Sequence, residues 1–371
     1  MPTVLQAGKP VLGTDFIGRE KEALLLNNLL EGGQSVVLIA PRRYGKTSLM
    51  LHTLEQMRMN GHFAAQIDLF STPSVRSLAE KITREVLANK KLDLAFNKLK
   101  ENIKNIFQNV ELKQTVEEFE FLLTFTEPKT DEFRLLEESI DFAEKFAVKH
   151  SKKLIIGLDE FGDVDKFGGD HVLKMFRSKI QLQKNVSYIF SGSYESVMSK
   201  LFVSPKAPFY RFARILTLDM ISKNEFVPFI KSKCLNNQIK ILDEALNKLL
   251  AITQGHPYYT QLFLQNILLY SESESIITEN QIDEILNTIL ITEISYFEKM
   301  WEEISSSRET TGVIMALANK TESLYSSLDW KKINISRTLR KLEDKGIIRK
   351  NGKVTRFSDP LLLIWIEQNI S

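Results

Sequence analysis

The first 220 residues alternate short apolar runs with amphipathic stretches. Residues 35–39 form an apolar run rich in β-branched side chains, as in a strand that is buried in a parallel sheet. Residues 47–54 have helical spacing instead, with Leu51 and Leu54 on one face. This part of the chain is therefore predicted to run strand, loop, helix.

Three further apolar runs are predicted to be strands, at residues 62–69, 153–158 and 186–190. Apolar strands separated by helical stretches are typical of α/β proteins with a parallel sheet. The segment from about 91 to 150 is rich in Lys, Glu and Phe, and we expect it to be a helical insertion with a loop near residues 127–129. Residues 221–300 have a helical pattern without a strong strand.

The pattern changes again from about residue 301. Helices are predicted at residues 311–318, 324–328 and 334–343, and Gly346 stands where a glycine commonly ends a helix. A hairpin is predicted around Asn351 and Gly352, because Asn-Gly is a strong turn signal. Three helices followed by a hairpin predict a winged helix-turn-helix.

Composition narrows the class of protein. The chain has 371 residues, a single cysteine (Cys234) and five scattered histidines, so neither an intramolecular disulfide nor a histidine–cysteine metal cluster is expected. No apolar run approaches the roughly 20 residues that a membrane span needs. The N-terminus lacks the pattern of a signal peptide. We therefore expect a cytoplasmic protein without a membrane partner.

The loop between the first predicted strand and helix resembles a phosphate-binding loop. It reads A-P-R-R-Y-G-K-T from Ala40 to Thr47, so the pattern G-x-x-x-x-G-K-[ST] is matched except at its first glycine. Lys46 is expected to reach the β- and γ-phosphates, and the Thr47 hydroxyl to bind Mg²⁺. Gly45 allows close approach of the backbone, and a small residue such as Ala40 suffices if its φ is negative. The alternative is an ordinary basic loop before a helix.

Acidic and hydroxyl side chains follow two of the other predicted strands. Asp159 and Glu160 end the run at 153–158; Asp159 is expected to support Mg²⁺ and Glu160 to polarise an attacking water as general base. Ser191 or Ser193, after the run at 186–190, is a candidate for contacting the γ-phosphate or the water. A solvated acidic turn and a polar turn are the alternatives.

Together these motifs resemble the archaeal-type ATPase family, an AAA+ and STAND-class group of P-loop NTPases. The F-I-G-R-E opening that begins at Phe16, the P-R-R-Y-G-K-T loop and the G-H-P motif at Gly255–Pro257 carry the resemblance. It implies an AAA+ three-layer α/β core with a parallel sheet at residues 1–220, a helical lid at 221–300 and a winged helix-turn-helix at 301–371. It also implies ATP or ADP with Mg²⁺ as ligands.

The resemblance assigns roles to further residues. Phe16 and Ile17 would line the adenine pocket, and Arg19 would fix this segment. The remaining loop positions expected at the nucleotide are Pro41, Arg42, Arg43, Tyr44 and Ser48. His256 would approach the phosphates and Pro257 would pack near the base as a nucleotide sensor, although G-H-P is also an ordinary helix start with proline in the first turn.

One region departs from the family pattern. The family has P-[FL]-Y-[GN]-R, but here Tyr210 directly precedes Arg211, and Arg214 follows. Either arginine is a candidate for phosphate contact in cis, action on a neighbouring subunit or an ordinary salt bridge. Without a clear arginine finger, a resting monomer is favoured.

Charge is concentrated near the C-terminus. Residues 308–356 carry twelve Lys or Arg and five Asp or Glu, an excess of seven positive charges, whereas the whole chain carries only +2. A basic module on an acidic body is typical of nucleic-acid binding. The candidate contacts are Arg337, Arg340 and Lys341 on the predicted third helix, with Arg349, Lys350 and Lys353 on the hairpin.

The sequence therefore predicts a Mg²⁺-dependent ATPase that works as a nucleotide-driven switch and moves a C-terminal winged helix. Two alternatives stay open. One is a DNA-binding regulator that holds nucleotide with little turnover. The other is a scaffold whose winged helix binds a protein instead of double-stranded DNA.

Overall fold

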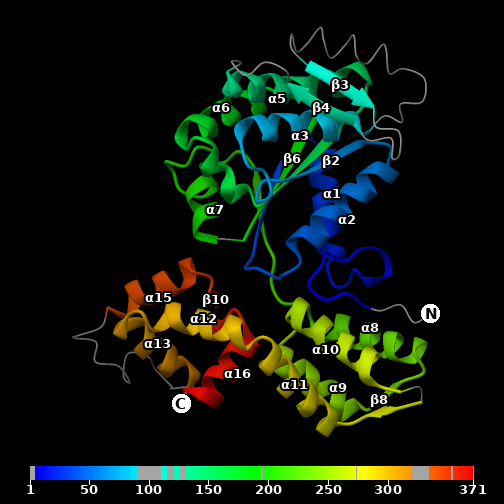
Figure 1. The fold of residues 1–371 in the computed structure, drawn as a ribbon, viewed down its shortest axis with the longest axis vertical. Helices are drawn as coiled ribbons and strands as arrows, with labels where there is room; N and C mark the ends of the chain where they lie inside the picture. Colours follow the sequence, from blue (N-terminus) through cyan, green and yellow to red (C-terminus); the bar gives the residue numbers. More distant parts are fainter. Residues whose placement is uncertain are drawn as a thin grey trace.

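The computed structural model describes residues 5–89, 110–114, 121–125, 131–193, 195–272, 274–319, 334–351 and 354–370. In Figure 1 a sheet covered by helices lies above two helical groups, one at the lower right and one at the lower left. We call these parts the sheet unit, the lid helices and the C-terminal module. They follow one another along the chain.

The sheet unit is built on five parallel strands in the order β2-β5-β6-β1-β7. Their bounds are β1 Val36–Ile39, β2 Phe63–Asp68, β5 Leu154–Asp159, β6 Val186–Gly192 and β7 Arg214–Thr217. The first four match the predicted runs. Since β1 lies between β6 and β7, which both come much later in sequence, the loop after β1 opens beside the ends of strands from distant parts of the chain.

Helices cover both faces of this sheet. Alternate residues of β1 point to opposite sides, so that Val36 and Leu38 pack with α1 and α2, while Val37 and Ile39 belong to the core under α3, α5, α6 and α7. The helices are α1 Glu20–Glu31, α2 Lys46–Met59, α3 Val75–Leu87, α5 Glu132–Lys149, α6 Asp170–Ile180 and α7 Glu195–Phe202. The predicted three-layer α/β fold is confirmed.

The segment predicted as a helical insertion, about 91–150, is helical only in part. Its described residues include an antiparallel pair of strands, β3 Val110–Gln114 and β4 Phe121–Phe125, and the long helix α5, which packs on α3 and the sheet. The prediction of helix was wrong for β3, where V-E-L-K-Q alternates with a period of two. The loop expected near residues 127–129 lies outside the described residues.

Four helices of the lid follow the sheet unit: α8 Lys223–Asn236, α9 Asp243–Thr253, α10 Pro257–Tyr270 and α11 Glu279–Thr292. Two short parallel strands, β8 Lys240–Ile241 and β9 Ile276–Ile277, join them at one side. His256 caps α10 by accepting the backbone N–H of Tyr259, and Pro257 is its first residue. The G-H-P motif is therefore a helix start as well as a candidate sensor.

The C-terminal module contains α12 Ile294–Ser305, α13 Arg308–Ala318, α15 Ile335–Asp344 and α16 Pro360–Asn369. The strands β10 Ile348–Asn351 and β11 Val354–Phe357 form an antiparallel hairpin after α15. Gly346 ends α15 with a φ of 72°, as predicted. The helix predicted at 324–328 lies outside the described residues, so the winged helix stays a prediction.

The lid helices and the C-terminal module share one hydrophobic cluster, which includes residues from Ile221 to Ile366 and also Leu5 near the N-terminus. This cluster is separate from the two cores that flank the sheet. The lower half of the molecule in Figure 1 is thus a continuously packed body. Within the described residues, no helix is long and apolar enough to cross a membrane.

Candidate functional site

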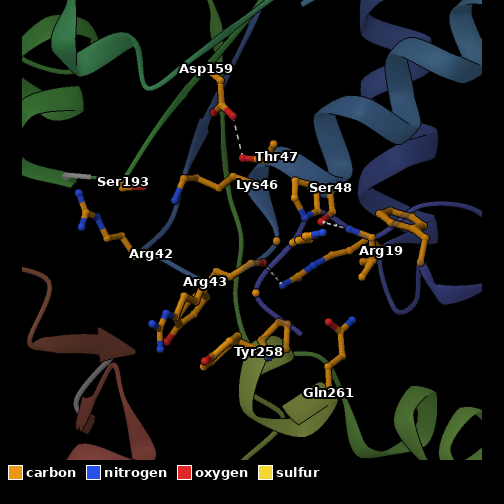
Figure 2. Close-up of a pocket in the computed structure, with 18 of the residues that line it drawn as sticks. Arg19, Arg42, Arg43, Lys46, Thr47, Ser48, Asp159, Ser193, Tyr258 and Gln261 are labelled. Atoms are coloured by element: carbon orange, nitrogen blue, oxygen red, sulfur yellow. Dashed lines mark hydrogen bonds between the residues drawn. The ribbon is translucent and has the colours of Figure 1, made fainter. Parts of the chain in front are cut away.

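A cavity of about 600 Å³ lies between the sheet unit and the lid helices. Three segments form its walls: the N-terminal stretch at residues 8–19, the loop between β1 and α2, and the start of α10. The ends of β2, β5 and β6 close it on the far side. Figure 2 shows labelled side chains from the N-terminal stretch, the loop, α10 and the ends of β5 and β6 around one space.

The loop between β1 and α2 has the backbone of a phosphate cradle. Gly45 has a φ of 84° and Arg43 a φ of 66°, and α2 begins at Lys46, so its first N–H groups face the cavity. Ala40 is fully buried at the end of β1 and has a negative φ. Alanine therefore meets the backbone requirement at this position without strain.

Lys46 is nearly buried, with 5% of its surface exposed. Its ammonium donates to the carbonyl oxygens of Ala40 and Pro41, both at 2.8 Å. Burial lowers the pKa of Lys46 to about 8, although Glu160 and Asp159 oppose the shift. A phosphate beside Lys46 would replace the two carbonyls and supply a full negative charge.

Asp159 and Thr47 both line the cavity and are hydrogen-bonded to each other. The Thr47 hydroxyl donates to Asp159 Oδ2 at 2.7 Å, a contact drawn in Figure 2. A hydroxyl oxygen beside a carboxylate fits the oxygen preference of Mg²⁺. The described residues include no group of three or more His, Cys, Asp or Glu that could hold a metal, so phosphate and water oxygens would have to complete the coordination.

Glu160 is oriented by the end of β6. Its carboxylate accepts the backbone N–H of Ser193 at 3.0 Å and also the Ser193 hydroxyl. Glu160 has a φ of 48°, which is uncommon for a non-glycine residue and marks a position where the surrounding structure holds strain. Both residues line the cavity, so Glu160 and the candidate Ser193 lie together there.

Ser191 has a different position from Ser193. It is completely buried within β6, and its hydroxyl has no partner among the described residues. It does not line the cavity, whereas Ser193 does. The structure thus favours Ser193 of the two serines that the sequence left open, because the strand continues to Gly192 and only the residue after it reaches the cavity.

The other end of the cavity is more apolar. Phe16 and Ile17 line it, and the Phe16 ring stacks on His52 with the ring centroids 4.1 Å apart. Ser48, on the first turn of α2, accepts the backbone N–H of Val11 at 3.0 Å and so fixes the N-terminal stretch against α2. Phe16, Ile17 and Ser48 therefore form one wall of the cavity.

Arg19 ties three parts of the site together. It is buried, and it donates to the backbone carbonyls of Tyr44 in the loop and Asp219 after β7, besides pairing with Glu22. Burial lowers its pKa in spite of the neighbouring acids. Arg19 therefore has the fixing role that was expected from the F-I-G-R-E motif.

The remaining loop residues divide into two groups. Arg42 lines the cavity and, in Figure 2, extends toward Ser193. Pro41 is buried and does not line the cavity. Arg43 and Tyr44 also line the cavity, but their side chains form contacts with residues outside it. Arg43 pairs with Glu293 at 2.9 Å and lies over the Tyr258 ring, whose centroid is 4.1 Å away.

His256 does not line the cavity, although Pro257 does. It is 2% exposed and packs edge-on against Tyr44, with the ring centroids 4.9 Å apart. Burial, together with nearby Arg43, lowers its pKa to about 3, so the ring is neutral at physiological pH. Any effect of His256 on bound phosphate would therefore be indirect, through Tyr44 of the phosphate loop.

Several cavity residues were not singled out from the sequence, among them Phe70, Asp163 and Gln261. Gln261 has no motif around it, because a lone polar residue in an apolar helix carries no distinctive pattern. Asp68, the last residue of β2, lines the cavity and also accepts the Phe70 N–H. Its position is therefore compatible both with facing a nucleotide and with holding the turn after β2.

Arg211 and Arg214 do not line the cavity. Within the described part of the chain, neither of them forms an ion pair, and the Arg211 guanidinium lies over the ring of Tyr210 at 5.2 Å from its centroid. A contact of either arginine with a nucleotide in the same chain is therefore not favoured by this geometry.

Residues 16–263 match the model of a family described as an ATPase domain predominantly from Archaea. The chain belongs to this family. The match covers two thirds of the sequence and includes the loop, both acidic residues and the G-H-P motif. This ATPase is therefore an ATP-binding, ATP-hydrolysing enzyme, as the resemblance implied.

Solved structures with the same fold span the whole chain. The Walker-type ATPase paby2304 of Pyrococcus abyssi has a TM-score of 0.70 at 15% identity and covers 98% of this chain and 100% of its own. The ORC2 protein of Aeropyrum pernix in its ADP form has a TM-score of 0.53 at 13% identity, covering 97% and 95%. No curated protein matches the ATPase. At these identities the structures establish the fold.

Proposed function

We propose that this ATPase is a Mg²⁺-dependent nucleotide switch that moves its C-terminal module. The observation that carries the proposal is the position of Arg43 and Tyr44. They belong to the phosphate loop, yet Arg43 pairs with Glu293 at the start of the C-terminal module, and the Tyr44 hydroxyl donates to the Ser358 carbonyl at 2.7 Å. The loop that would hold the nucleotide is thus bonded to the part that would move.

The phosphate groups would bind at the start of α2. Lys46 and the backbone N–H groups of this turn would hold them, and the helix dipole favours negative charge there. Thr47 and Asp159 would hold Mg²⁺, which supplies charge neutralisation during phosphoryl transfer. Glu160 is the candidate base, since its carboxylate faces the same cavity and Ser193 fixes its orientation.

Nucleotide binding would affect the lid and the C-terminal module, because the phosphate loop would have to rearrange to accept the phosphates. Lys46 is hydrogen-bonded to carbonyls of its own loop, and a phosphate would draw the ammonium away from them. Tyr44 is two residues from Lys46 and packs on His256 while its hydroxyl bonds to Ser358. A change in the loop therefore acts on both the lid and the C-terminal module.

A second set of contacts holds the C-terminal module against the sheet unit. Arg349 on β10 lies 3.2 Å from Asp219 and 3.8 Å from Glu195, and its guanidinium is 5.3 Å from the Tyr44 ring centroid. Helix α15 also packs beside α7. Arg349, a sequence candidate for nucleic acid, is thus engaged with the sheet unit.

Double-stranded DNA is the partner that the charges favour for the C-terminal module. Arg337, Arg340 and Lys341 are exposed on α15, and Lys350 is exposed on β10, while Lys353 lies outside the described residues. Exposed cations on one helix and an adjacent strand supply the phosphate contacts on which DNA affinity depends. A protein partner is the alternative, and the protein is proposed to rest as a monomer in the cytoplasm.

The switch can be tested by distance measurement between the two parts. Fluorophores would be placed at Leu182→Cys, beyond α6, and Gln368→Cys, on α16, which are both exposed; the native Cys234 is buried. We expect Glu160→Gln to bind ATP without hydrolysing it and to hold a changed distance. In the parent, the distance should return to its ADP value as ATP is consumed.

Lys46→Ala provides the control, because it should remove both nucleotide binding and the distance change. An identical distance with ATP, with ADP and without nucleotide in the Glu160→Gln protein would refute the switch. Unchanged turnover in that variant would refute the assignment of Glu160 as the base.

A further inference from the structure

Gln261 is a buried amide that faces the cavity. It lies on α10 one helical turn after Pro257, and only 7% of its surface is exposed. Its side chain lines the cavity, and Figure 2 shows the amide end rising from α10 toward Arg19. Across the described parts of the chain, the amide forms no hydrogen bond.

The other uncharged polar side chains of the cavity are all engaged. Thr47 donates to Asp159, Ser193 to Glu160 and Tyr258 to Glu293, while Ser48 accepts the Val11 N–H.

The residue is largely buried, but its amide is open to the cavity, so a ligand there could take up the hydrogen bonds that the chain leaves unmade. Gln261 is therefore placed to bond to a ligand atom in the cavity.

The position of Gln261 decides which part of a ligand it meets. Figure 2 places it on the side of Arg19 and Ser48, away from Asp159 and the tip of Lys46. Pro257 lies one turn before it on α10, and the cavity wall also includes the apolar side chains of Ile17 and Ile221. A flat apolar ring would pack on such a wall, whereas a phosphate would not.

We propose that the Gln261 amide hydrogen-bonds the nucleobase and recognises its 6-amino group. The amide oxygen would accept from the amino group while the amide N–H₂ donates to the adjacent ring nitrogen, the paired pattern by which glutamine reads adenine. This inference rests on the proposed nucleotide site. It makes Gln261 the residue that couples base identity to the lid, because α10 carries it.

The test is a cycle that removes each partner of the bond in turn. The parent and Gln261→Met would be titrated with ATP and with purine riboside triphosphate, which has the same ring without the 6-amino group. Methionine keeps the length of the side chain and removes its hydrogen bonds. Tripolyphosphate, which has no base, serves as the third ligand.

We expect Gln261→Met to weaken ATP binding roughly tenfold, the size of one or two hydrogen bonds. The parent should also bind the purine analogue more weakly than ATP, by a smaller factor, because the analogue keeps the ring nitrogen and loses only the bond to the 6-amino group. In Gln261→Met, ATP and the analogue should bind alike, because the bond is absent in both, and the affinity for tripolyphosphate should equal that of the parent.

Gln368→Met on the exposed end of α16 is the matched control and should bind every ligand as the parent does. Thermal unfolding of each variant verifies that it folds. Equal losses for ATP and the purine analogue, or no loss for either, would overturn the role of Gln261. If the parent binds neither ATP nor tripolyphosphate, the nucleotide site itself is wrong, and the inference is overturned with it.

Discussion

Ala40 shows how a single residue can depart from a motif without loss of its geometry. The strained positions of the phosphate loop are Arg43 and Gly45, which have positive φ values, and not the first position. Ala40 is buried at the strand end with an ordinary backbone. The glycine of the usual pattern is therefore not required there, because a methyl group fits the space and the backbone needs no left-handed residue.

His256 provides a pH-dependent prediction at the scale of one side chain. Its pKa is lowered from 6.5 to about 3 in the folded protein. Between pH 6.5 and about pH 3, His256 binds a proton in the unfolded chain but not in the folded protein, so the free energy of unfolding falls as the pH falls. Going from pH 7 to pH 5 should cost the folded state roughly 2 kcal/mol through this residue.

His256→Asn removes the titrating group while keeping a side chain that can cap α10. Urea unfolding at pH 7 and pH 5 should show a smaller loss of stability for this variant than for the parent. The same loss in both proteins would mean that His256 becomes protonated without cost, contrary to its burial beside Tyr44 and Arg43.

At the scale of elements, the contact between the segment before α8 and the turn before α10 depends on Gly255. Its φ is 77°, and a Cβ there would overlap the backbone carbonyl oxygen of Ile221. Ile221 in turn donates its N–H to the Gly255 carbonyl at 2.9 Å. Two backbone segments thus touch at the point where α10 begins, and glycine is the residue that allows the contact.

Gly255→Ala should therefore be strongly destabilising. A left-handed backbone costs alanine about 1–2 kcal/mol, and displacing the Ile221 segment should add a further ~1–3 kcal/mol. Gly33→Ala is the control, since Gly33 has a φ of 81° but open space around its Cβ position. Thermal unfolding should show the larger loss for Gly255; equal losses would show that the Ile221 contact yields freely.

At the scale of the whole molecule, the basic C-terminal module packs against the sheet unit. Arg349 bonds to Asp219 and Glu195, so that part of its positive charge is neutralised within the chain. Arg337 and Arg340 stay exposed on α15. If the module is released by ATP, the cations available to DNA should increase.

We expect duplex DNA to bind more tightly to Glu160→Gln with ATP than without it. Because coupling between two ligands is reciprocal, DNA should tighten ATP binding by the same factor. Arg349→Ala should weaken this coupling by releasing the module in advance. Arg340→Ala should instead lower the slope of log affinity against log salt by about 1, as expected for one lost phosphate contact. Fluorescence anisotropy at several salt concentrations measures both effects.

The local patterns of the sequence determined the α/β fold, four sheet strands and the loop from Ala40 to Thr47, because strand and helix periodicity and the P-loop motif depend on neighbouring residues. Asp159 and Glu160 could be assigned for the same reason, as acidic residues that end a buried strand. The choice of Ser193 over Ser191 could not, since it depends on where β6 ends.

Only the tertiary structure decided which distant residues meet. Gln261 has no sequence signal, and its role arises because α10 is turned toward Arg19 across the cavity. Arg349 lies 130 positions from Asp219, and Tyr44 lies 314 from Ser358. Such contacts depend on how the packed body of lid and C-terminal module is placed on the sheet unit, and local periodicity carries no information about that placement.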